Sequence, residues 1–207
     1  MFLGIINLPT IITFLGMFMA LSTIFLAYSG HFAGALITLM YAGICDLSDG
    51  ALARRMTLSE EEQAFGVQID SIIDMASFGV APALFALLLG MNSIPDMILL
   101  TFFVSCAAMR LAYFNVHGLV ADGGKKFYTG LPVTYAAMIF PLVGVLQVFV
   151  TPELFAIIFR ATVLVTSLLF IMKVQTPKPS GKGLIVFPLV AIGFTVFYAT
   201  TTILPLP

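Results

Sequence analysis

Long apolar stretches separated by short polar connections dominate the pattern of this chain. Seven stretches of about 20 residues are long enough to cross a membrane hydrocarbon core of about 30 Å. They lie near 8–28, 32–53, 66–90, 95–116, 131–150, 154–173 and 184–204. The pattern predicts an all-α fold: a polytopic membrane helical bundle of six to seven transmembrane helices, with the whole chain, 1–207, in one domain.

The composition supports a membrane protein. The chain has 207 residues, of which 60% are hydrophobic and 9% are charged. A soluble domain needs about a quarter of its residues charged, so we expect membrane lipid to surround most of this chain. No nucleic-acid partner is expected. Cys45 and Cys106 fall inside apolar stretches, where we interpret them as small packing residues.

The basic residues in the connections favour one orientation in the membrane. They fall only in alternate connections, whose lysines and arginines are Arg54, Arg55, Lys125, Lys126, Lys173, Lys178 and Lys182. Because positive residues stay on the cytoplasmic side, these connections are predicted to face the cytoplasm. We therefore expect a protein integral to the cytoplasmic membrane, with the N-terminus inside and, for seven spans, the C-terminus outside.

Four aspartates flank the connection between the second and third apolar stretches. Asp46 and Asp49 end the second stretch, and Asp70 and Asp74 begin the third. All four should lie at similar depth near the cytoplasmic face. Residues three or four apart share one face of a helix, so two neighbouring helices can direct these carboxylates into one cleft.

Buried carboxylates at membrane depth are costly unless they are paired. Arg54 is the one nearby arginine in the helical pattern, so divalent cations are the better partner, and hard oxygen ligands suit Mg²⁺ or Mn²⁺. Gly50, Ala53 and Gly66 lie on the same helix faces and would let a ligand approach closely, although ordinary helix packing also explains small residues. Glu60, Glu61 and Glu62 are interpreted as a solvated loop without chemistry.

The spacing of these residues resembles a family signature. Asp46-x2-Asp49-Gly50-x2-Ala53-Arg54, followed by Gly66-x3-Asp70-x3-Asp74, resembles the motif of the CDP-alcohol phosphatidyltransferases. "AFGVQIDSIIDMASFGVAPA" (64–83), "RLAYFNV" (110–116) and "GLPVTYAA" (130–137) are similar to the integral-membrane phosphatidylserine synthases of that family. The chain departs from that group at Tyr113, where an arginine is expected, and at Thr134, where a proline is expected. The family core has six spans, so a seventh would be an addition.

The resemblance implies transfer of a phosphatidyl group from CDP-diacylglycerol to the hydroxyl of L-serine, with release of CMP. It implies two divalent cations, Mg²⁺ or Mn²⁺, held by Asp46, Asp49, Asp70 and Asp74, with Asp74 also acting as the catalytic base. It further implies a homodimer. The implied contacts to CDP-diacylglycerol are Asn7, Thr10, Asp49, Gly50, Ala53, Arg54 and Gly66. For Asn7 and Thr10, helix capping is an equally good interpretation.

The acceptor needs its own anchor for the carboxylate of serine. Arg110, inside the fourth stretch, is the best bidentate partner, and Asn115 is a second candidate. The alternative for Arg110 is a structural ion pair with one of the aspartates. Lys125, Lys126 and Tyr128 are weaker candidates. Arg160, in the outer half of the sixth stretch, is expected to extend outward or to pair with Glu153.

The sequence is also compatible with two alternative functions. A related enzyme could use glycerol 3-phosphate or an inositol phosphate as acceptor, but a phosphorylated acceptor would favour a basic cluster near Arg110. A cation transporter could also keep aspartates within a membrane. Its binding site is expected near the bilayer midplane between repeats, whereas these aspartates lie at the membrane edge and the sequence shows no repeat.

Overall fold

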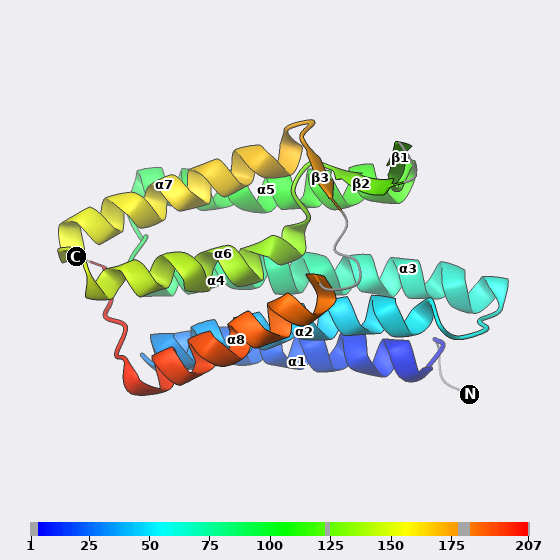
Figure 1. Ribbon diagram of the computed structural model, residues 1–207. Helices are drawn as coiled ribbons and strands as arrows, with labels where there is room; N and C mark the ends of the chain where they lie inside the picture. Colours follow the sequence, from blue (N-terminus) through cyan, green and yellow to red (C-terminus); the bar gives the residue numbers. More distant parts are fainter. Residues whose placement is uncertain (1–3, 123–124, 178–182, 207) are drawn as a thin grey trace.

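The computed structural model describes residues 4–122, 125–177 and 183–206, and helices make up most of it (Figure 1). Each of the seven apolar stretches forms helix. The α-helices are α1 Leu8–Tyr28, α2 Phe32–Ala53, α3 Glu60–Asp74, α4 Ala81–Leu89, α5 Ile94–His117, α6 Ala136–Gly144, α7 Pro152–Ile171 and α8 Gly183–Thr200. Short helical segments adjoin some of them. Segment η1 Met75–Val80 links α3 to α4, η2 Val133–Tyr135 precedes α6, and η3 Val145–Val148 follows α6.

Capping residues explain where several helices begin. Asn7, Ser59, Ser93 and Thr151 precede α1, α3, α5 and α7, and each side chain accepts a hydrogen bond from a backbone N–H of the first turn. Ser59 and Glu62 complete a capping box. The loop expected over Glu60–Glu62 is therefore wrong, because these residues form the first turn of α3.

Helix α3 continues through η1 into α4 as one helical segment from Glu60 to Leu89. Segment η1 is a π-helix that begins directly after Asp74. Among the described residues, five helical segments are long and apolar enough to cross a membrane: α1, α2, α3 to α4, α5 and α7. The segments 133–148 and 186–200 are apolar but shorter. The chain is thus an integral membrane protein with a polytopic helical fold.

The interior is packed with aromatic rings, and the outside is apolar. Phe85, Phe103, Phe140 and Phe159 are buried and contact one another at ring-centroid distances of 5.3–6.4 Å, joining α4, α5, α6 and α7. By contrast, α1 exposes large apolar side chains such as Phe18 and Phe25, which are 62% and 69% exposed. Such a surface is stable in lipid and not in water.

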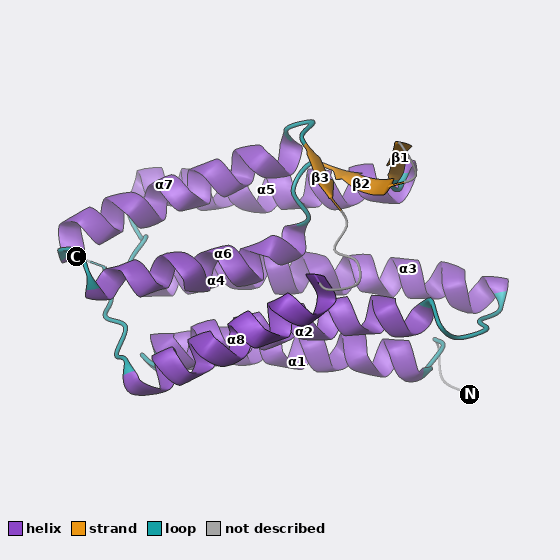
Figure 2. Ribbon diagram, viewed as in Figure 1, coloured by secondary structure: helices purple, strands orange, loops and turns teal. Residues whose placement is uncertain are grey.

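A small sheet lies at the end of the bundle where α5 ends (Figure 2). Strands β1 Val120–Asp122, β2 Lys125–Thr129 and β3 Gln175–Pro177 pair antiparallel in the order β1-β2-β3. The sheet joins the connection after α5 to the connection after α7, both of which the sequence predicted as loops. Helices α6 and α8 begin well inside this end of the bundle, whereas α2 and α3 extend past them (Figure 1).

Candidate active site

Three of the four aspartates form a compact cluster between α2 and α3. Carboxylate oxygens of Asp46, Asp49 and Asp70 lie within 4.8 Å of one another. Asp74, one turn beyond Asp70, lies outside this three-residue cluster but next to Asp46. All four aspartates line one cavity. The i, i+3 and i, i+4 spacings thus bring the carboxylates together as the pattern predicted.

Hydroxyl groups hold the two carboxylates of α2. Thr13 of α1 donates a hydrogen bond of 2.6 Å to Oδ2 of Asp49, and Thr134 of η2 donates one of 2.9 Å to Oδ2 of Asp46. Among the side chains that the structure describes, the one ion pair lies elsewhere, so no Lys or Arg neutralises these aspartates. A cluster of hard, anionic oxygens without a protein cation fits a divalent metal ion.

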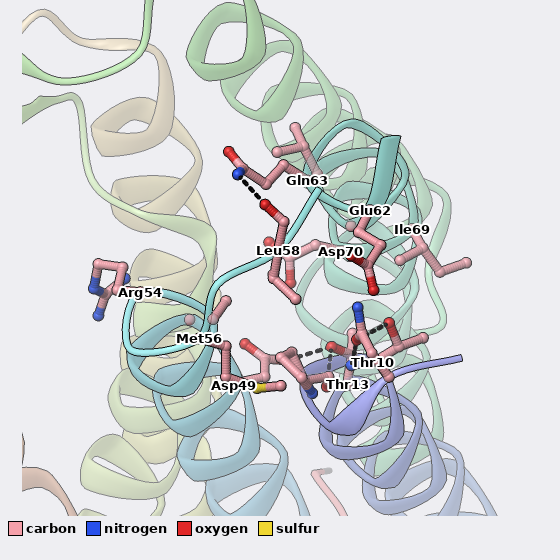
Figure 3. Close-up of a pocket in the computed structure, with 16 residues that line it drawn as sticks. Thr10, Thr13, Asp49, Arg54, Met56, Leu58, Glu62, Gln63, Ile69 and Asp70 are labelled. Carbon is pink, nitrogen blue, oxygen red and sulfur yellow. Dashed lines mark hydrogen bonds between the residues drawn. The ribbon is translucent and has the colours of Figure 1, made fainter. Parts of the chain in front are cut away.

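The larger of two cavities at the cluster has a volume of about 480 Å³ and lies between α1, α2 and the start of α3 (Figure 3). In Figure 3, Thr10, Thr13 and Asp49 lie in the lower part of the view, Asp70 lies above them, and Arg54 lies to the left. All seven residues predicted from the resemblance to contact CDP-diacylglycerol line it: Asn7, Thr10, Asp49, Gly50, Ala53, Arg54 and Gly66. We name it the α1–α3 cavity.

Gly66 shows why a small residue suits this wall. A Cβ atom built at Gly66 would meet nothing within 4 Å, so the backbone here faces open space. At Gly50, a Cβ would lie 3.2 Å from the Arg54 side chain. Both glycines therefore leave room beside the aspartates for a ligand, and neither is required by tight helix packing.

The smaller cavity, of about 200 Å³, lies on the other side of the aspartates. We name it the Arg110 cavity. It shares Asp49, Gly50, Arg54 and Asp70 with the α1–α3 cavity. Its other charged and aromatic lining residues are Asp46, Asp74, Arg110, Phe114 and Tyr128. The carboxylates therefore lie where the two cavities meet.

Arg110 is buried in an aromatic setting. It is 4% exposed, its Nε donates a hydrogen bond of 3.1 Å to the carbonyl of Leu131, and its guanidinium lies 5.2 Å and 5.7 Å from the ring centroids of Phe114 and Tyr128. The alternative of an ion pair with an aspartate is not observed among the described side chains. Burial raises the pKa of the Tyr128 hydroxyl above its ordinary value.

The connection "GLPVTY" reaches the site because of its glycine. Gly130 has a φ of +81°, and a Cβ there would lie 2.7 Å from the carbonyl oxygen of Phe170. Backbone hydrogen bonds from Gly130 and Leu131 fasten the turn to the end of α7. Pro132 then precedes η2, which carries Thr134 to Asp46. Substitution of Gly130 would therefore displace both Leu131 and Thr134.

The structure places two other predicted polar residues, Asn115 and Arg160, outside both cavities. Asn115 exchanges hydrogen bonds with Ser71 at the surface, and it does not line the Arg110 cavity. Arg160 makes a bidentate ion pair with Asp96 at 2.7 Å and 3.0 Å, so the expected pairing with Glu153 is wrong. Packing of α7 against α5 places Asp96 closer to the guanidinium than Glu153, which is in the first turn of Arg160's own helix.

Comparison of the sequence with known proteins shows the family to which the chain belongs. The profile of the CDP-alcohol phosphatidyltransferases matches residues 6–168. The chain is 41% identical over 97 residues to the CDP-diacylglycerol–serine O-phosphatidyltransferase of Saccharomyces cerevisiae, covering 44% of this chain and 34% of the yeast protein. It is 33% identical over 133 residues to the enzyme of that name from Helicobacter pylori, covering 63% of this chain and 54% of that protein.

An archaeal relative matches over a greater length. The archaetidylserine synthase of Methanothermobacter thermautotrophicus is 30% identical over 180 residues, which cover 86% of this chain and 72% of that protein. The chain thus spans about a third of the yeast relative and about half of the Helicobacter one, but most of the archaeal one. On the family profile and this match, the chain belongs to the CDP-alcohol phosphatidyltransferase family.

Proposed function

We propose that this protein is a phosphatidylserine synthase, which transfers the phosphatidyl group of CDP-diacylglycerol to the hydroxyl of L-serine and releases CMP. The meeting of two cavities at one aspartate cluster carries the proposal. A transferase must hold a donor and an acceptor on either side of one reacting phosphorus. The names of the yeast and Helicobacter relatives support serine as the acceptor.

The α1–α3 cavity is proposed to hold the cytidine and diphosphate of the donor. Its volume of about 480 Å³ falls in the range of small-molecule sites, and Asn7, Thr10 and Arg54 offer polar contacts along its wall. The open space at Gly66 and Gly50 lets the diphosphate approach the backbone of α2 and α3. With the diphosphate bound in this way, the scissile phosphorus would lie near the aspartates.

Asp46, Asp49 and Asp70, with Asp74 beside them, are proposed to hold two divalent cations, Mg²⁺ or Mn²⁺. When bound, these ions would neutralise the diphosphate and stabilise the CMP leaving group. The fit rests on the hard carboxylate oxygens and on the lack of a cationic side chain paired with them among the described residues. Thr13 and Thr134 each donate a hydrogen bond to one oxygen of Asp49 and Asp46, which orients both carboxylates.

Serine is proposed to enter the Arg110 cavity with its carboxylate against the guanidinium of Arg110. Nε of Arg110 already donates to Leu131, so the terminal nitrogens remain as donors. Asp74 takes the proton of the serine hydroxyl, and the oxygen attacks the phosphorus that carries the lipid. The bond from that phosphorus to the CMP oxygen breaks, giving phosphatidylserine and CMP. The basic connections favour a reaction at the cytoplasmic face of the cell membrane.

The proposal is tested with the purified protein in detergent, Mn²⁺ or Mg²⁺ and CDP-diacylglycerol. Serine, glycerol 3-phosphate and an inositol phosphate are added in turn, and both CMP and the lipid product are measured. Because the archaetidylserine synthase matches over most of its length, the CDP-activated archaeal ether lipid is tested as a second donor. CMP release that requires serine supports the proposal, whereas release with another acceptor alone contradicts the serine assignment.

A further inference from the structure

One carboxylate of the α1–α3 cavity has no part in the mechanism above. Glu62, in the first turn of α3, lines this cavity away from the aspartate cluster. Figure 3 shows its side chain extending from α3 toward the start of α1, where Thr10 lies. Its Oε2 accepts hydrogen bonds from the backbone nitrogen and the hydroxyl of Ser59, at 2.8 Å and 2.9 Å. The capping box thus fixes the carboxylate at the cavity wall through Oε2, and the cap does not use Oε1.

A hydrogen-bond donor of fixed orientation lies beside this carboxylate. Oδ1 of Asn7 accepts from the backbone nitrogen of Thr10 at 3.1 Å and from its hydroxyl at 2.8 Å. Capping of α1 therefore sets the amide so that Nδ2 is its outward group, which can only donate. The Asn7 amide lies close enough to the Glu62 carboxylate to interact with it. The wall thus presents an acceptor and a donor side by side.

This order of groups is complementary to one pyrimidine and not to the other. The exocyclic amine of cytosine donates to a carboxylate, and its neighbouring ring nitrogen accepts. Uracil has a carbonyl oxygen in place of the amine and an N–H in place of the acceptor. Against Glu62 and Asn7, uracil would set acceptor against acceptor and donor against donor. Unpaired or opposed polar groups are how binding sites reject a close analogue.

We propose that Glu62 and Asn7 read the base of the nucleotide-activated lipid and select cytosine over uracil. The inference rests on the proposed function in assigning the α1–α3 cavity to the nucleotide. It gives Glu62 a role in specificity that is separate from the aspartate chemistry. It also explains how Asn7 can cap a helix and bind a ligand, because capping uses Oδ1 and binding uses Nδ2.

Glu62→Gln is the sharpest test, because glutamine also completes a capping box and so keeps the turn. The substitution replaces the carboxylate with an amide that can present a donor. Binding of CMP and of UMP, each with Mn²⁺, is measured by calorimetry on the detergent-solubilised protein. The native protein should bind CMP at least about tenfold more tightly than UMP, and Glu62→Gln should reduce this ratio about tenfold, chiefly through weaker CMP binding.

Glu61→Gln is the matched control, because Glu61 is exposed on the next position of the same turn and lines neither cavity. It should leave the CMP to UMP ratio unchanged. If Glu62→Gln does not fold, Asn7→Ser takes its place, because serine still caps α1 but offers no amide donor. It too should lower the ratio.

Equal affinity of the native protein for CMP and UMP would overturn the inference, as would a ratio unchanged in the folded Glu62→Gln or Asn7→Ser variant. The proposed function fails by a different result, namely no release of CMP with serine. Nucleotide binding is measured without turnover, so the two failures are distinguishable.

Discussion

The hydroxyl of Thr134 donates a hydrogen bond of 2.9 Å to Oδ2 of Asp46, and so joins η2 to the aspartate cluster between α2 and α3. A hydrogen bond to a metal-binding carboxylate orients it, and removing such a partner typically lowers metal affinity about 10- to 100-fold. Thr134→Val should therefore raise the Mn²⁺ concentration for half-maximal binding about tenfold. Manganese binding by electron paramagnetic resonance, after chelation and without substrates, measures this directly.

Thr134→Ser provides the matched control, because it keeps the hydroxyl and loses only a methyl group. It should restore manganese affinity close to that of the native protein. Equal affinities for the valine and native proteins would show that Asp46 does not depend on Thr134 for its orientation.

Asp74 is the proposed base, and Asp74→Asn removes its ability to take a proton while keeping its shape. The turnover rate should fall by at least about 100-fold, the lower range for loss of a general base. Binding of CMP with Mn²⁺ should weaken far less than turnover, because Asp46, Asp49 and Asp70 still form the cluster when Asp74 is lost as a metal ligand. A variant that loses CMP binding in proportion to turnover would make Asp74 a binding residue and not the base.

Arg110 is the proposed anchor for the serine carboxylate. Kinetics can distinguish this binding role from a purely structural role. Arg110→Lys keeps the charge but loses the bidentate geometry. The KM for serine should rise about tenfold or more, while the KM for CDP-diacylglycerol stays within about twofold. Equal changes in both constants would instead assign Arg110 a structural role in holding Leu131, Phe114 and Tyr128.

The ion pair between Arg160 and Asp96 is expected to stabilise the bundle and not the reaction. Asp96 has a side chain only 4% exposed, so Arg160→Met leaves a buried carboxylate without its cation. The free energy of unfolding should fall by roughly 1–3 kcal/mol, the cost of leaving a buried polar group without its partner, visible as a lower thermal unfolding midpoint. Because the pair lies at the opposite end of α5 from Arg110, both KM values should stay unchanged.

The double variant Asp96→Asn with Arg160→Met is the control for this prediction. It removes the uncompensated charge and should recover part of the lost stability. A double variant as unstable as the single one would mean that packing of the Arg160 stem matters more than the charge.

The sequence predicted those parts of the site that depend on local spacing. Asp46 and Asp49 share a face of α2, and Asp70 and Asp74 share a face of α3, because the helical period alone sets these relations. The apolar stretches likewise predicted where helices form. Helix α3 began earlier than expected, because the capping box at Ser59 extends it beyond the apolar segment.

Contacts between distant segments could not be predicted in this way. Thr134 reaches Asp46 across 88 residues, and this contact depends on the turn at Gly130 against α7. The partner of Arg160 depends on which helix α7 packs against. Glu62 looked like part of a solvated acidic run, and its serine three residues earlier was the signal that it begins a helix.

Transfer of the phosphatidyl group to serine is tested by following the label of radioactive serine in the presence of CDP-diacylglycerol and Mn²⁺. The native protein should transfer the label into a lipid that comigrates with phosphatidylserine, with one CMP released for each labelled lipid, and Asp74→Asn should not. Release of CMP without label in lipid would contradict the assignment of this protein as a phosphatidylserine synthase. So would transfer of a different labelled acceptor, but not of serine, into lipid.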